Sequence, residues 1–100
     1  MITIIAGDRG FNSYKKFCEA LEEIGTDISH VFTMGNTPPN SFGMRWAFDN
    51  NLPCKAFPPD MKKFMIAEAE DIIYFKKRKS SPQLLEMAQR GGLEIYEYEF

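Results

Sequence analysis

The sequence predicts a small α/β domain: a Rossmann-like, doubly wound sheet of about five mainly parallel strands with helices on both faces. Short apolar, β-favouring runs alternate with amphipathic helical patterns along all 100 residues, and that alternation is typical of parallel strands joined by right-handed crossovers. The runs at 1–6, 30–34 and 71–75 are almost continuously apolar, as strands covered on both faces should be. This length fits a single domain over residues 1–100.

The first half of the chain contains three predicted strands and two helices. Strand 1–6 ends at a glycine turn, and a helix follows from a cap at Asn12 or Ser13 to a stop at Gly25. Strand 30–34 leads through a Pro-Pro loop into a helix over 40–50, and strand 53–57 completes this half. The side chains expected to face inward recur at helical spacing; they are Tyr14, Phe17, Cys18, Leu21 and Ile24, then Met44, Ala47 and Phe48.

The second half contains two predicted helices and two strands. After Pro58-Pro59, Asp60 is expected to cap a helix, and strand 71–75 then leads into a basic turn, KKRK. Ser80-Ser81-Pro82 predicts a serine cap with proline at the first helical position, and Gly91-Gly92 ends that helix. Strand 93–100 alternates glutamate with aromatic residues, which indicates an exposed edge. The inward side chains expected here are Met61, Phe64, Met65, Leu84, Leu85 and Ala88.

Composition excludes several function classes. The net charge of −2 gives no global attraction for nucleic acid or membrane, and the basic turn alone does not outweigh an isoelectric point near 5.4. No run of 18 apolar residues and no signal peptide occurs, so we expect a cytoplasmic protein that does not enter membranes. Cys18 and Cys54 are expected to be buried, reduced thiols. His30 lies at the wrong end of its strand for a site, and no metal-ligand spacing occurs, so we expect no metal and no cofactor.

Three turns follow strands at the carboxyl edge of the predicted sheet, where ligands bind in open parallel sheets. They supply glycines for close backbone approach, helix starts for anions, and cations for phosphate. Each has a plain alternative: a simple glycine turn with an Asp8–Arg9 surface ion pair, a helix cap, or a solvated basic run. None is a complete phosphate-binding or dinucleotide fingerprint. The candidate binding residues are Gly7, Asp8, Arg9, Gly35, Asn36, Thr37, Asn40, Ser41, Lys77, Ser80 and Ser81.

Four colinear steps in the chain carry a family resemblance. They are a strand followed by Gly-Asp-Arg-Gly-Phe (7–11), the loop Gly-Asn-Thr-Pro-Pro-Asn-Ser-Phe-Gly (35–43), Arg-Trp-Ala (45–47) with Leu-Pro (52–53), and Phe-Pro-Pro-Asp (57–60). This order resembles the SLOG superfamily, specifically its small YspA/YpsA-like Rossmann-like branch. The resemblance implies binding of a nucleotide or nucleotide-derived ligand by the first two loops and by Ser80 and Ser81. Some relatives hydrolyse nucleoside monophosphates, others sense signalling nucleotides, and small members often occur in phages and mobile elements.

Several positions depart from the family pattern. Met34 and Pro38 stand where glycines are usual, Thr37 replaces a basic residue, and Asn40 replaces the acid. These departures favour a degenerate site that binds its ligand without strong catalysis, and we assign no catalytic residue. One alternative is a nucleoside-monophosphate phosphoribohydrolase that uses Asp8 as its acid and Arg9 on the phosphate. Another is a protein-interaction module, an inhibitor or a homodimer that uses the edge strand with Tyr96, Tyr98 and Phe100.

Overall fold

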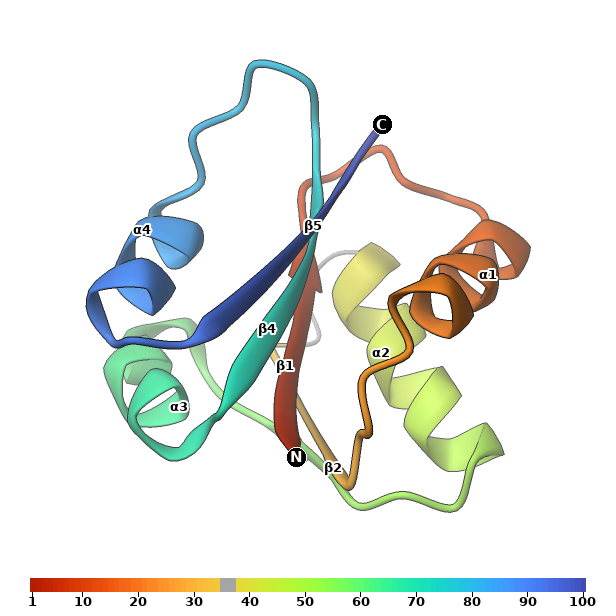
Figure 1. Ribbon diagram of the computed structural model, residues 1–100, viewed down its shortest axis with the longest axis horizontal. Coiled ribbons are helices and arrows are strands. Elements are labelled where there is room, and N and C mark those ends of the chain that lie inside the picture. Colours follow the sequence, from red (N-terminus) through yellow and green to blue (C-terminus); the bar gives the residue numbers. More distant parts are fainter. Residues whose placement is uncertain (35–37) are drawn as a thin grey trace.

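The computed structural model describes residues 1–34 and 38–100, and its centre is one five-stranded sheet (Figure 1). The strands are all parallel and lie in the order β3-β2-β1-β4-β5. This arrangement confirms the predicted α/β class and the doubly wound sheet. The strands are β1 (Ile2–Gly7), β2 (His30–Thr33), β3 (Cys54–Ala56), β4 (Asp71–Lys76) and β5 (Glu94–Glu99).

Helices cover both faces of the sheet. Figure 1 shows α1 and α2 on one side and α3 and α4 on the other. Neighbouring strand residues point to opposite faces, so Ile5 packs beneath α1 and α2 while Ile4 packs beneath α3 and α4. The helices are α1 (Tyr14–Ile24), α2 (Pro38–Asp49), the 3₁₀ turn η1 (Pro59–Met61), α3 (Lys62–Glu68) and α4 (Gln83–Arg90).

A polar contact fixes α1 against α2. The Tyr14 hydroxyl donates a hydrogen bond of 2.8 Å to the Asp49 carboxylate, and the Arg45 guanidinium lies 4.0 Å from the centre of the Tyr14 ring. Burial and the bond to Asp49 raise the pKa of Tyr14 above its usual value. The hydroxyl therefore stays protonated and keeps donating at neutral pH.

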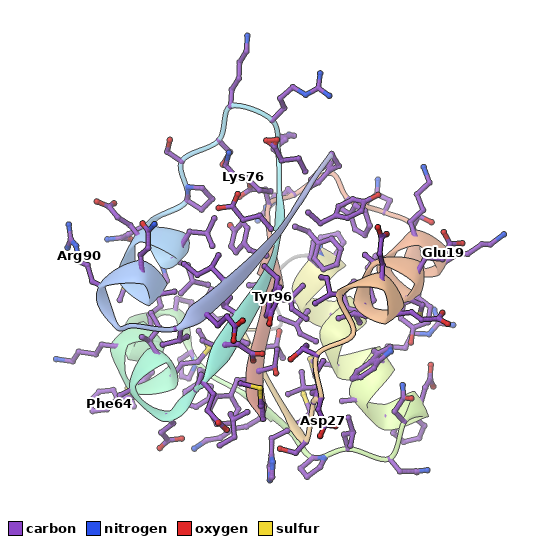
Figure 2. All side chains as sticks on the ribbon, viewed as in Figure 1. Glu19, Asp27, Phe64, Lys76, Arg90 and Tyr96 are labelled. Carbon is purple, nitrogen blue, oxygen red and sulfur yellow. The ribbon has the colours of Figure 1, made fainter. Side chains whose placement is uncertain are left out.

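The predicted inward faces of two helices are only partly right. Ala47 and Met65 are buried, but Met44 is 42% exposed, Phe48 83% and Phe64 49%, and Figure 2 shows Phe64 pointing away from the core. Helix α2 packs through its small residues, because a Cβ at Gly43 would lie 3.1 Å from the Ile5 Cβ. That close approach turns the larger side chains outward. Met61 is also exposed, at 37%.

Other local predictions need correction as well. Cys18 and Cys54 are free thiols, as expected, but Cys54 is exposed and Cys18 only half-buried. Cys54 lies on β3, which pairs with β2 alone in the described part of the chain. Asp60 does not cap a helix; it lies inside η1. Of the helices in residues 1–34 and 38–100, none has the length and apolar character needed to cross a membrane.

A buried polar cluster lies at the amino end of the sheet. Asp71 is fully buried, and its Oδ2 accepts a hydrogen bond of 2.9 Å from the Thr26 hydroxyl. Within the residues described, Asp71 Oδ1 and the hydroxyl of Thr3 have no hydrogen-bond partner. Thr3 and Asp71 are register partners on β1 and β4. A carboxylate with a single neutral partner is costly to bury.

Candidate functional site

The carboxyl ends of β1 and β4 form the topological switch point of this sheet. The chain passes from β1 to β2 and β3 on one side, and then from β4 to β5 on the other. In open α/β sheets this is where crevices form, because the two neighbouring loops turn in opposite directions. The turn after β4 lies at the same end of the molecule as the end of β1 (Figure 1).

A cavity of about 210 Å³ opens at this point, and we call it the switch-point pocket. Its walls come from the ends of β1 and β2, from α2, from the start of α3, from β4 and from the start of α4. The turns after the first, second and fourth strands therefore meet at one rim. The lining residues are Ala6, Gly7, Asp8, Met34, Asn40, Lys62, Tyr74, Pro82, Gln83 and Leu84.

Gly7 allows the close packing that shapes this rim. A Cβ at this position would lie 2.7 Å from the Pro39 Cβ, and 2.8 Å from both the Cβ and the carbonyl oxygen of Phe75. Gly7 is therefore required for close approach between β1, α2 and β4. Gly10, by contrast, has a φ of +111° and provides the turn itself.

Asp8 is held by the turn that follows β4. Its Oδ1 accepts a 2.8 Å hydrogen bond from the Tyr74 hydroxyl, and its Oδ2 accepts one of 2.9 Å from the Lys77 backbone N–H. Partial burial raises the pKa of Asp8, but hydrogen bonds from Lys77, Ser80 and Tyr74 and the Lys77 charge outweigh it and leave the pKa below its usual value. Asp8 is therefore ionised at neutral pH and joins β1 to the β4–α4 turn.

The Tyr74 hydroxyl stays protonated at neutral pH and donates its hydrogen bond to Asp8. Burial, the bond to Asp8 and the charge of Asp8 all raise the pKa of Tyr74. Its ring packs in the core beneath α3 and α4, and its hydroxyl reaches the pocket. The Asp8–Tyr74 pair therefore presents a carboxylate and a phenol at one wall.

Two features of the pocket favour anions: Lys62, which was missed from the sequence, and the start of α4, which was expected as a helix start. Lys62, the first residue of α3, is the one cationic residue among the described lining residues. Within the same part of the chain no side chain caps α4, so its first N–H groups keep their capacity to bind an anion. Lys62 could have been found by including the segment after β3, whose carboxyl end also lies at this edge.

None of the four residues of the predicted basic turn is among the described residues that line the pocket. Lys76 contacts a separate hollow beside β5, and Figure 2 shows it near the carboxyl end of the sheet. The end of the Lys77 side chain lies near Gly10, 3.4 Å from the position a Cβ would take there. Arg9 is exposed, and the described residues give it no ion pair with Asp8. The plain alternative of an Asp8–Arg9 surface pair is therefore wrong.

The predicted cap at Ser13 is confirmed, since its hydroxyl accepts the Lys16 N–H at the start of α1, but the predicted serine cap of α4 is wrong. Pro82, not a serine, is the N-cap of α4, because Lys79 adopts a left-handed φ of +66° and the turn places the serines before the helix. Ser80 instead supports Asp8, and both serines line the hollow on the α4 side of β5. They are placed outside the switch-point pocket.

The second predicted loop is described only in part. Gly35, Asn36 and Thr37 lie outside the described residues. Helix α2 begins at Pro38, two residues before the predicted start, because prolines are tolerated in the first turn. Asn40 is therefore buried inside that turn and lines the pocket, where the Thr33 hydroxyl lies 2.9 Å from its carbonyl oxygen. Ser41 is exposed and donates to the Pro38 carbonyl instead of capping the helix.

Comparison with known proteins does not assign this site. No protein-family model matches the chain, and no curated protein matches its sequence. Across residues 1–34 and 38–100, no three histidine, cysteine, aspartate or glutamate side chains gather to hold a metal ion. The chemistry of the pocket therefore has to be judged from its own residues: one cation, one carboxylate, one phenol and a helix start.

Proposed function

We propose that this protein binds a nucleotide or a nucleotide-derived ligand in the switch-point pocket, without strong catalysis. The observation that carries the proposal is the meeting of Lys62 with the uncapped start of α4 at a topological switch point. A cation and free helix N–H groups favour a phosphate at that wall. The resemblance to the SLOG superfamily supports the same ligand class.

The charges in the pocket orient the proposed ligand. Asp8 is ionised and repels a phosphate, so the phosphate lies toward Lys62 and α4. The remaining lone-pair capacity of Asp8, with the Tyr74 hydroxyl, suits a sugar hydroxyl of the same ligand. A volume of about 210 Å³ is below the usual range for whole drug-sized ligands. The pocket thus accommodates a sugar phosphate, with the base at the open side.

The state of Asp8 favours binding over hydrolysis. Cleavage of a glycosidic bond needs a proton donor with a pKa near the working pH. The lowered pKa of Asp8 leaves it without that proton, and two protein donors already occupy its oxygens. The phosphoribohydrolase alternative therefore has little support from its only candidate acid.

Isothermal titration with nucleoside monophosphates, cyclic nucleotides and ADP-ribose tests the proposal. We expect saturable binding of at least one phosphorylated compound and none of the matching unphosphorylated nucleoside. Lys62→Ala should weaken binding about tenfold, the value of one charge-assisted hydrogen bond. Lys63→Ala is the matched control, since Lys63 lies over the Phe64 ring and does not line the pocket. Equal loss in both variants, or no binding across the panel, would contradict the proposal.

A further inference from the structure

The free edge of β5 is the largest feature that the proposed function does not use. In the described part of the chain β5 pairs with β4 alone, over six residues without a proline or a lysine. The N–H groups of Glu94 and Phe100 point to β4, where they bond the carbonyls of Glu70 and Lys76. Backbone groups alternate along a strand, so those of Ile95, Glu97 and Glu99 point outward at this edge.

The two sides of this edge differ in chemistry. Register with β4 places Tyr96, Tyr98 and Phe100 on the α1 side, where they flank the core. The same register places Glu97 and Glu99 on the α4 side, opposite Tyr74 and Lys76. The α1 side of the edge is therefore mainly aromatic, with Glu94 at its start, and the α4 side carries two glutamates beyond Ile95. Figure 2 shows Tyr96 on this strand, at the front of the molecule.

Hollows flank the edge on both faces. On the α1 side, one of about 350 Å³ is lined by Phe11, Lys16 and Phe100, and one of about 360 Å³ by Ala20, Glu23, Ile24 and Glu97; Tyr98 lines both. On the α4 side, a third of about 440 Å³ is lined by Lys76, Leu85 and Glu97. A strand added beside β5 would direct alternate side chains to these two faces.

We propose that the β5 edge binds an extended basic segment of a partner protein by strand addition, with apolar side chains toward α1 and lysine or arginine over Glu97 and Glu99. Charge identifies the occupant, since neither ion pair in the described residues involves β5; Glu94 is bonded to the Tyr96 hydroxyl, while Glu97 and Glu99 lie on the α4 side. The cations near this region are Lys76 on the neighbouring strand, Lys16 at the hollow lined by Phe11 and Phe100, and Lys77, whose side chain lies beside Gly10.

The same charges oppose a second copy of this chain in two antiparallel registers of the strand pair. Antiparallel pairing of two β5 strands centred on Glu97 sets this residue against its own copy. Pairing centred on Tyr98 sets Glu97 against Glu99. Like charges directly opposite one another destabilise a strand pair. A strand with lysine or arginine opposite Glu97 and Glu99 would instead form stabilising pairs of opposite charge. The proposal concerns a different surface from the switch-point pocket and does not depend on it.

Fluorescence anisotropy with labelled, end-blocked eight-residue peptides tests this inference. A peptide of alternating lysine and valine should bind, and one of alternating glutamate and valine should bind at least tenfold more weakly. A lysine–valine peptide N-methylated at alternate amides keeps its charge but cannot pair, so it should also lose tenfold or more. Absence of binding by the first peptide, or equal binding by its methylated form, would overturn strand addition. Without binding, the glutamates would instead protect the edge against pairing.

Variants of the protein give a second test of strand addition at β5. Glu97→Pro removes an outward N–H without breaking a bond to β4, so it should weaken peptide binding more than Glu97→Gln does. Glu19→Gln, on the outer face of α1 (Figure 2), should leave binding unchanged. Equal binding by Glu97→Pro and Glu97→Gln would count against main-chain pairing. Sedimentation of the protein alone adds a check: a dimer lost in Glu97→Pro would identify a second copy as the occupant and overturn the proposal.

Discussion

Replacing Gly7 by alanine tests the packing that forms the rim of the switch-point pocket. The new methyl group would lie 2.7 Å from the Pro39 Cβ and 2.8 Å from the Phe75 carbonyl oxygen. Neither atom can be moved by rotating a side chain, so α2 or β4 must shift. Overpacking of this kind typically costs 1–3 kcal/mol, and we expect about 2–3 kcal/mol here. For a domain of this size that corresponds to a fall in Tm of roughly 10–20 °C.

Urea and thermal denaturation followed by circular dichroism measure this effect. Gly91→Ala is the matched control: its methyl group would also meet an atom at 2.7 Å, but that atom is the branch methyl Cγ2 of Ile66, and the nearest backbone atom, the Met87 carbonyl oxygen, lies at 3.4 Å. The control should therefore lose clearly less stability. A Gly7→Ala protein within about 0.5 kcal/mol of the parent, the range of ordinary surface substitutions, would refute the close approach of β1, α2 and β4.

Three further predictions concern polar groups. Asp71→Asn should raise the free energy of unfolding by about 1 kcal/mol, because the amide can donate to the Thr3 hydroxyl, which is unpartnered among the described residues, and keeps an acceptor for Thr26; a loss in urea denaturation would contradict this. Folding lowers the pKa of Asp8, so its ionised form stabilises the fold above its ordinary pKa of 3.8, and this contribution disappears as the pH falls through the folded-state value. Asp8→Asn should flatten stability between pH 6 and about 3, and curves parallel to the parent's would count against it. Tyr14→Phe should cost about 0.5–1 kcal/mol by removing the bond to Asp49, with no change in Tm as the opposing result.

The fold was largely predictable because its signals are local and repeated. Continuous apolar runs identified β1, β2 and β4, and the alternation of strand and helix patterns implied one parallel sheet. The inward face of α2 was not predictable from apolar spacing. It packs through Pro39, Gly43 and Ala47, whose small size matters only when the distance to the sheet is known.

The place of the site was easier to predict than its residues. Parallel topology alone brings the turns after β1, β2 and β4 to one edge, and Gly7, Asp8 and Asn40 are placed in its pocket. The placement of Ser80 and Ser81 before α4 follows the left-handed backbone of Lys79, and no sequence pattern predicts that conformation for a lysine. Lys62 was missed because a lysine at a helix start carries no motif. Including the segment after β3 among the turns at this edge would have pointed to it, and the contacts of α3 with β1 bring it to the pocket.

An ¹⁵N-resolved NMR titration with a nucleoside monophosphate tests the central claim most directly. We predict saturable shifts confined to amides around the switch-point pocket, led by Gly7, Lys62, Gln83 and Leu84, with the amides of β5 unaffected. Saturable shifts centred elsewhere, or a spectrum unchanged at millimolar ligand, would contradict a nucleotide site at this end of the sheet.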